Sequence, residues 1–331
     1  MPAAPGAAGT SLLDEVRRRW HEADPLLPAP TAPTPDGSCG VLLTVTGADG
    51  QTLAAAACEH WQRDPESLEL TWGAARRFQL TAQVGGPDVA GALDELVELW
   101  HVHLADIPGA DDPDSAAVVL WPSRDIEGVR TLLRRGFAPR GVVAARQARG
   151  RPGSAPSPPG RVRDMPGTTR FDVRRAGSAD TDTVARLGLE VIRYDAHFGG
   201  VVERPSTARA LQAELAAMLA EPEPWIWLTE RDAVALGVLI AEPPPAQWIA
   251  PLVGVAPVAY NMLTFVSPAH RGAGAAPVLV DCFHDAADAA GLPATMLHYE
   301  QTNPLSAPFW ARQGYRPLWT SWEARPACTV R

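Results

Sequence analysis

The segment that most constrains this chain is a strand-like run that leads through a turn of small residues into an apolar helix start. Residues 263–266 are β-branched and aromatic, residues 267–276 read Ser-Pro-Ala-His-Arg-Gly-Ala-Gly-Ala-Ala, and the apolar run 278–280 follows. Such a turn places unpaired backbone N–H groups at the positive end of a helix dipole, where a diphosphate can bind. Two glycines at this position can instead serve the backbone angles alone. The segment therefore predicts a phosphate-binding loop, with an ordinary turn as the alternative.

A second group of residues follows this loop at fixed offsets. Residues 295–299 read as a strand, and Asn303, Ser306, Trp310 and the pair Gly314-Tyr315 come after it, on an expected short helix and the turn beyond. Because the loop and this segment occur in a set order and separation, together they are more specific than either motif alone.

With both motifs, the second half of the chain resembles the acyl-CoA-binding half of the GNAT acetyltransferase superfamily. The loop of that family has an Arg or Gln, two free positions, a Gly, one free position, and a Gly or Ala, which Arg271, Gly274 and Ala276 match. Its later segment has an Asn, a small residue three on, an aromatic about a turn beyond, and a Gly-aromatic pair. These are matched in order by Asn303, Ser306, Trp310 and Gly314-Tyr315.

The resemblance implies an α+β fold of two tandem GNAT-like domains, each with a mixed, mostly antiparallel twisted sheet flanked by helices and a splayed central strand pair. We expect an N-terminal helix and Pro-rich connector over 1–37, a degenerate domain over 38–149, a Pro, Gly and Arg-rich linker over 150–168, and the acyl-CoA-binding domain over 169–331. A repeat supports two copies: 133–139 and 311–317 share an Arg two before a Gly-aromatic pair and a Pro two after the aromatic.

The resemblance also implies which residues bind acyl-CoA. Pantetheine would lie between the strands 260–266 and 295–299 and bond the main chain near Phe265 and Val266. The pyrophosphate would be bound by Arg271 and the loop amides, and further contacts would come from the later segment. The expected cofactor-binding residues are Phe265, Val266, Arg271, Gly272, Ala273, Gly274, Ala275, Ala276, Asn303, Ser306, Phe309 and Trp310. Asn303 precedes a proline and could equally start a turn or cap the next helix.

The candidate catalytic residues are Tyr260, His298, Glu300 and Trp310. An ammonium must lose a proton before it attacks a thioester, and the first three are candidate bases near the expected centre. Many members of the family have a Tyr at position 310 that would protonate the departing thiolate. An indole N–H does not give up its proton near neutral pH, so packing is the favoured interpretation of Trp310, with Ser306, Tyr299 or water as the acid.

The acceptor pocket is expected between the first two helices of the second domain, where Tyr194, His197 and Phe198 lie. In the first half, the corresponding turn reads Val-Gly-Gly-Pro-Asp over 84–88. Pro87 removes an N–H and Asp88 puts a negative charge at the helix start, so we expect this half to be catalytically silent and to act as an intramolecular partner.

Composition excludes several functions. The net charge is −9, which argues against nucleic-acid binding. All 29 basic residues are Arg, which excludes a lysine Schiff base or a Walker-type lysine. The Cys residues lie far apart without a Cys-x-x-Cys pair, no metal site is expected, and no apolar run approaches membrane-spanning length. We therefore expect a cytoplasmic protein.

These observations predict an N-acyltransferase that moves an acyl group, above all acetyl, from acyl-CoA to an amine of a small molecule in a ternary complex. The expected cosubstrate is acetyl-CoA, and the chain is expected to be a monomer with an internal pseudo-dimer or a homodimer. Two alternatives stay open at this point: an acyl-CoA sensor without turnover, and an acetyltransferase acting on proteins or peptides.

Overall fold

The computed structural model describes residues 11–35, 40–148 and 171–330. These residues form two compact units that do not follow the chain order. The first unit takes its residues from Met1–Gln62, Arg76–Pro139 and Thr320–Arg331, and the second from Arg63–Ala75 and Arg140–Trp319. Each unit has its own apolar core.

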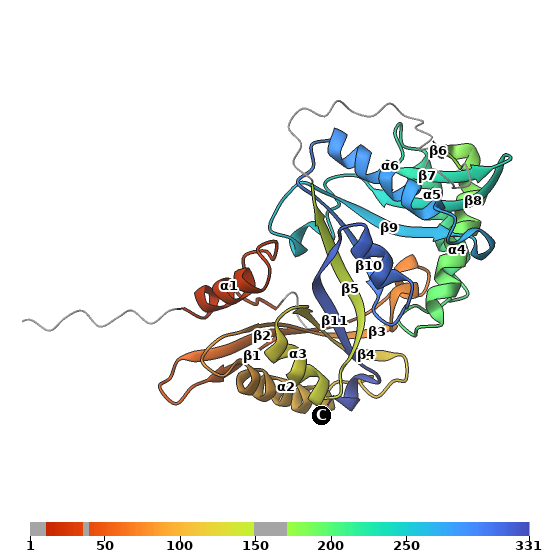
Figure 1. The fold of residues 1–331 in the computed structure, drawn as a ribbon. Helices are drawn as coiled ribbons and strands as arrows, with labels where there is room; N and C mark the ends of the chain where they lie inside the picture. The colour runs from red at the N-terminus through yellow and green to blue at the C-terminus, as the bar shows by residue number, and fades with distance from the viewer. Residues whose placement is uncertain (1–10, 36–39, 149–170, 331) are drawn as a thin grey trace, which may run out of the picture. The chain divides into compact units, whose positions relative to one another are not determined.

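The first unit is a sheet with helices on both faces (Figure 1). Its strands β1, β2 and β3 are antiparallel, and β4 runs parallel to β3. Helix α2 packs against β1, β2 and β3 on one face, beside α3, while α1 covers the other face. The bounds are α1 Leu12–Ala23, β1 Val41–Thr46, β2 Thr52–Gln62, β3 Arg76–Val84, α2 Val89–Ala105, β4 Ser115–Pro122 and α3 Ile126–Arg134.

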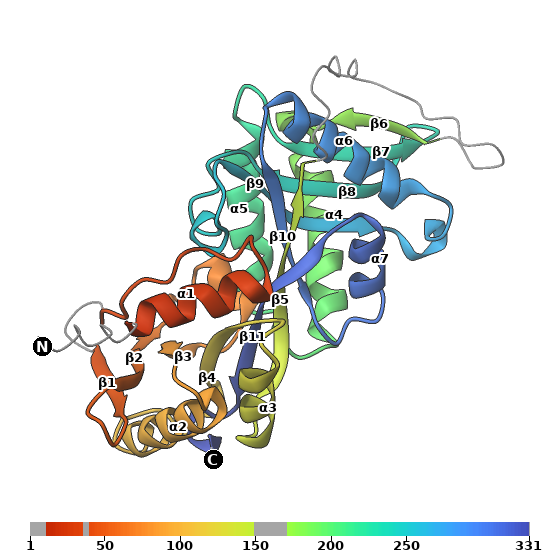
Figure 2. The same ribbon diagram turned by 60° about the vertical axis from the view of Figure 1, so that its left-hand side comes forward.

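The second unit repeats this plan with additional helices (Figure 2). Strands β6 to β9 are antiparallel, β10 is parallel to β9, and β5 is antiparallel to β10. One apolar cluster joins α6 and α7 to the sheet, and another joins α4 and α5 to the opposite face. The bounds are β5 Ala138–Gln147, β6 Asp172–Arg175, α4 Thr181–Ala196, α5 Thr207–Leu219, β7 Ile226–Arg231, β8 Val234–Glu242, β9 Val258–Val266, α6 Ala275–Ala289, β10 Ala294–Glu300, α7 Ser306–Arg312 and β11 Arg316–Ala324.

The predicted internal repeat is present in the structure. The chain passes through β1, β2, β3, α2, β4, α3 and β5, and then in the same order through β7, β8, β9, α6, β10, α7 and β11. The turns after α3 and α7 contain the same backbone hydrogen bond. The Phe137 N–H donates to the Leu132 carbonyl at 3.0 Å, and the Tyr315 N–H donates to the Trp310 carbonyl at 3.0 Å. The glycine before each aromatic has a positive φ, 84° and 88°. The α+β fold with two GNAT-like copies is thus confirmed.

The two copies exchange their last strands. Strand β5 follows β4 and α3 in the chain, yet it pairs along residues 141–147 with β10. Strand β11 follows β10 and α7, yet its C-terminal part lies in the first unit beside β4. The domain boundaries at 38–149 and 169–331 therefore stay a prediction, and the expected linker lies outside the described residues. In the described part of the chain, no helix is both long and apolar enough to cross a membrane.

Candidate functional site

The central strands of the second unit separate where the sequence predicts a splayed pair. Parallel pairing joins residues 258–261 of β9 to 294–297 of β10 and goes no further. At the same point, Ile240 of β8 pairs with Leu263 and Ala241 pairs with Asn261, so Met262 is the extra residue of a β-bulge. A bulge bends its strand and changes the local twist. The remainder of β9 therefore diverges from β10 and leaves main-chain groups along its edge without a strand partner.

The loop at the end of β9 has the geometry of an anion site. Gly272 and Gly274 have φ values of 77° and 96°, which strongly disfavour side chains, and Gly274 is the N-cap of α6. Within the described residues, the N–H groups of Gly272, Ala273 and Gly274 donate to no protein acceptor. Helix α6 begins at Ala275, so these amides lie at the positive end of a helix of 15 residues.

The Arg271 side chain packs against residues beside this loop. Its Nε donates to the Val266 carbonyl at 3.1 Å, and its guanidinium carbon lies 4.8 Å from the Tyr194 ring centre. Phe198 meets Tyr194 edge to face at 5.4 Å. Two of the three residues expected to shape the acceptor pocket thus lie beside the anion loop, while His197 is exposed at the end of α4.

Two predicted catalytic residues meet on neighbouring strands. The Tyr260 hydroxyl is hydrogen-bonded to His298 Nδ1, and the two rings stack with their centres 5.8 Å apart. Trp248 contacts the Tyr260 ring edge-on at 4.7 Å. Burial lowers the pKa of His298 to about 4 and raises the pKa of Tyr260 well above its usual value. Both groups are therefore neutral near pH 7, which suits a hydrogen-bonded pair better than a proton acceptor for an ammonium.

A pocket of about 340 Å³ opens beside Tyr260 and the bulge. Burial raises the pKa of Glu242, and burial together with the charge of Glu242 raises the pKa of Glu214. The charges of both carboxylates also contribute to the raised pKa of Tyr260. The lining residues are Glu214, Met218, Glu221, Glu223, Pro224, Trp225, Ala241, Glu242, Pro243, Trp248 and Met262. The pocket is thus acidic at its polar positions and aromatic or aliphatic elsewhere.

Sequence reasoning missed this pocket, and it contains none of Tyr194, His197 and Phe198. Its residues come from α5, the segment between α5 and β7, the end of β8, the segment after β8 and the bulge of β9, so they form no contiguous sequence motif. The available signal was the concentration of Glu residues in 214–223 and at 242 in a chain segment otherwise rich in apolar residues.

The other predicted residues have partners within the protein. Glu300 faces Gly200, where an added Cβ would collide with its carboxylate. Asn303 donates from Nδ2 to Asp195 Oδ1 at 3.0 Å and accepts from the Leu305 N–H at 3.0 Å, so it closes the turn before α7. Burial raises the pKa of Asp195 to about 6, which the hydrogen bond from Asn303 opposes.

Trp310 lies in the apolar core and not at the Tyr260–His298 pair. It is buried within the cluster between the sheet and α6, where its ring meets Phe309 at 4.8 Å and Tyr315 at 5.5 Å. Ser306 is the first residue of α7. The favoured interpretation of Trp310 as packing agrees with this position.

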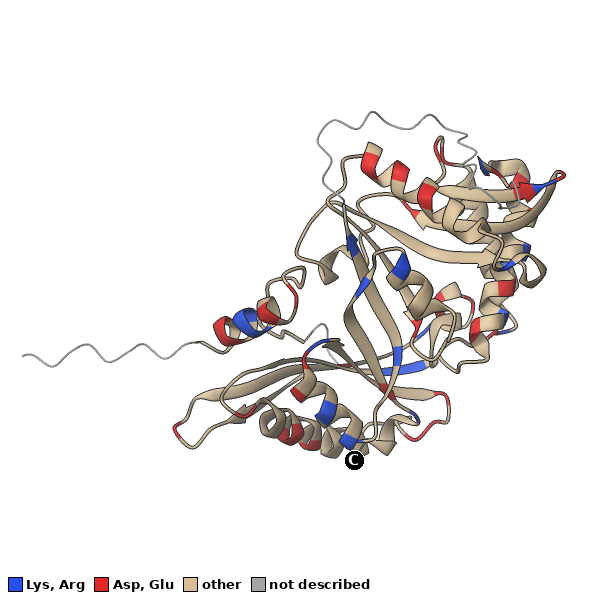
Figure 3. Ribbon diagram, in the orientation of Figure 1, with Lys and Arg blue, Asp and Glu red and all other residues tan. Residues whose placement is uncertain are grey.

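Charged residues occur on elements of both units (Figure 3). Acidic residues appear along α2, α4 and α6, and basic residues appear on α1, α3 and other elements.

Comparison with known proteins supports the fold. No family model and no curated protein matches the sequence. Among solved structures, the chain is similar to a GCN5-related N-acetyltransferase from Sphaerobacter thermophilus, with 13% identity over 86% of this chain and 80% of that chain and a TM-score of 0.53. A GNAT-family acetyltransferase from Colwellia psychrerythraea matches with 10% identity over 85% and 84% of the two chains and a TM-score of 0.47. The first similarity shows that this chain has the fold of GCN5-related N-acetyltransferases.

Proposed function

We propose that this protein transfers an acyl group, above all acetyl, from acyl-CoA to an amine of a small molecule. One observation supports this more than any other: β9 separates from β10 and then leads into a loop whose amides at 272–274 have no acceptor in the described part of the protein. A groove edged by free main-chain groups suits the pantetheine amides, and the loop suits the diphosphate.

The acceptor would enter through the acidic pocket beside Tyr260. Glu214 and Glu242 favour a cation, and the exposed face of Trp248 offers a cation–π contact. The raised pKa of Glu242 moves its carboxylate toward neutrality, the direction that a base for an ammonium requires. This acidic lining supports an amine acceptor.

In the proposed reaction, the ammonium gives a proton to Glu242, directly or through water, and the free amine nitrogen attacks the thioester carbonyl carbon. The carbon–sulfur bond breaks, an amide forms, and the thiolate of CoA leaves and takes up a proton. The neutral Tyr260 hydroxyl, hydrogen-bonded to His298, would in turn stabilise the developing charge by a hydrogen bond. No residue of the protein becomes covalently modified.

The test is a thiol-release assay with acetyl-CoA and a library of small amines, read together with the mass of the acylated product. We expect saturable thiol release that depends on both substrates, with dicationic amines preferred over neutral ones. Binding of acetyl-CoA without thiol release for any amine would contradict the enzymatic assignment. Absence of acetyl-CoA binding would contradict the site itself.

A further inference from the structure

The first unit contains the same kind of groove as the second. Its parallel pairing joins residues 76–80 of β3 to 115–119 of β4 and then stops, four residues before β3 ends at Val84. The turn that follows leads into α2, as the anion loop leads into α6. The predicted lack of catalysis in this half therefore does not come from a closed strand pair.

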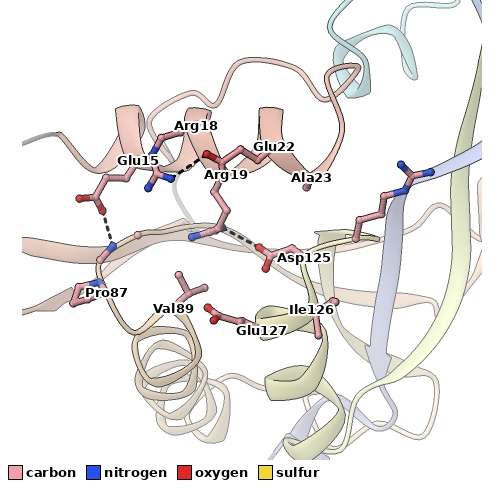
Figure 4. Close-up of a pocket in the computed structure, with 13 residues that line it drawn as sticks. Glu15, Arg18, Arg19, Glu22, Ala23, Pro87, Val89, Asp125, Ile126 and Glu127 are labelled. Atoms are coloured by element: carbon pink, nitrogen blue, oxygen red, sulfur yellow. Dashed lines mark hydrogen bonds and ion pairs between the residues drawn. The ribbon is translucent and has the colours of Figure 1, made fainter.

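Helix α1 lies across the open end of this groove (Figure 4). The Glu15 carboxylate accepts the Gly86 N–H at 2.6 Å, on the turn itself. Arg19 donates to the carbonyl of Val84, the last residue of β3, and its Nε lies 3.0 Å from the Asp125 carboxylate after β4. The helix thus provides an anion to the turn and a donor to the strand edge.

The fit between α1 and the turn is close. A Cβ added at Gly85 would lie 2.7 Å from Glu15 Oε2, so a larger residue there would displace the carboxylate. Val16 and Trp20, on the face of α1 toward the sheet, are buried. Beyond the helix, Arg124 lies 3.4 Å from Asp24, and Leu26 is buried. A helix held by apolar burial and by charged contacts at both ends is a fixed element of the unit.

The pocket that remains beside α1 does not resemble a diphosphate site. Its volume is about 700 Å³. Four of its lining residues are carboxylates and three are guanidiniums. Asp88 accepts the Gly91 N–H at 2.8 Å, which holds its carboxylate at the start of α2. This balance of charge gives a diphosphate no net attraction.

We propose that α1 is an internal pseudo-ligand that takes the place of acyl-CoA in the first unit. The Glu15 carboxylate occupies the anion position on the turn amide, and Arg19 bonds the strand edge that pantetheine would otherwise reach. The first unit is then closed to acyl-CoA by the chain's own helix, and the protein binds one acyl-CoA per chain.

The test compares two double variants of α1 by amide hydrogen exchange of residues 84–89. Glu15→Ala/Arg19→Ala removes both groove contacts, and Arg18→Ala/Glu22→Ala removes an ion pair with the same spacing whose side chains are 68% and 62% exposed. We expect exchange about tenfold faster or more in the first variant and about unchanged in the second. Equal exchange in the two variants would overturn the proposal. If the double variant does not fold, Glu15→Ala provides the same comparison at one contact.

Two further measurements separate an anion mimic from simple packing. Inorganic pyrophosphate should slow the exchange of residues 84–89 in Glu15→Ala, where the anion position is vacated, and not in the Arg18→Ala/Glu22→Ala control. No such slowing would overturn the mimicry. In the unaltered chain, acetyl-CoA should protect residues 262–276 and leave 84–89 unchanged. Protection of 84–89 would overturn the closure of the first unit, whereas lack of protection at 262–276 would instead contradict the proposed function.

Discussion

The two units provide different hydrogen-bond partners for the main-chain groups at the end of the splayed strand. At the end of β9, the Val266 carbonyl accepts from Arg271 of its own loop, while at the end of β3 the Val84 carbonyl accepts from Arg19 of α1. Gly86 donates to a carboxylate, whereas Gly272 and Gly274 have no protein acceptor among the described residues. The main-chain groups at a splayed strand pair therefore need hydrogen-bond partners. Helix α1 provides them in the first unit, and the second unit leaves its loop amides open to a ligand.

The chemistry differs at matched positions as well. Counted from the first residue of each parallel pairing, Phe78 and Val119 of the first unit correspond to Tyr260 and His298 of the second. At these two positions the first unit thus has neither a hydroxyl nor an imidazole. The comparison teaches that one copy has an apolar pair at these positions and a turn bonded by α1, while the other has a polar pair and, among the described residues, a loop whose amides lack protein acceptors.

The largest effect is expected from charging the two loops. Gly274→Glu places a carboxylate at the start of α6 and strains a residue with a φ of 96°, so acetyl-CoA affinity should fall more than about 100-fold. Gly86→Glu makes the equivalent change at a φ of 79° in the first unit and should leave the affinity unchanged. Titration calorimetry of both folded variants checks this, and equal losses would remove the distinction between the units.

Making the second unit resemble the first should lower turnover. Tyr260→Phe creates the residue that the first unit has at this position, and we expect kcat to fall about 100-fold with acetyl-CoA affinity unchanged. Tyr315→Phe is the matched control, because Tyr315 lies in the apolar cluster toward α6 and its hydroxyl is hydrogen-bonded to His284 and Thr295. Steady-state kinetics of the two variants provide the measurement. A similar loss in both would mean that Tyr260 acts only through packing.

Neutralising the acidic pocket should weaken acceptor binding. Glu214→Gln is expected to raise KM for a dicationic amine about tenfold, which corresponds to about 1.4 kcal/mol, and to change KM for a monoamine less. Glu203→Gln is the control, since Glu203 pairs with Arg193 outside the pocket. An unchanged KM for both amines in Glu214→Gln would place the acceptor elsewhere.

The smallest effect concerns stability alone. The pKa of Asp195 is raised to about 6, so the native state binds a proton that the unfolded chain releases near pH 4. Stability from this group is complete below pH 4 and is lost as the pH rises through 6. Asp195→Asn should therefore gain about 1–2 kcal/mol at pH 7.5 and flatten this part of the profile. Denaturant unfolding from pH 4 to 8 tests it, and a parallel profile would contradict the assignment.

Much of the second unit could be predicted from local pattern. The strands predicted at 260–266 and 295–299 lie within two residues of the bounds of β9 and β10, because runs of strand-forming residues between turns have short-range causes. The first-unit helix 126–134 was missed, since it is short and its apolar positions are few. Local sequence patterns thus predict strands with a strong pattern but not a short helix such as α3.

The sequence by itself determined the strand-to-helix turn at 271–276 and the two matched Gly-aromatic turns of the repeat, because each turn depends on residues close together in the chain. Only the tertiary structure decided which strands change units, that Glu15 and Arg19 reach Gly86 and Val84, and that Glu214 and Glu242 line one pocket. These contacts join residues far apart in the sequence. They depend on how helices and strands pack, which periodicity does not encode.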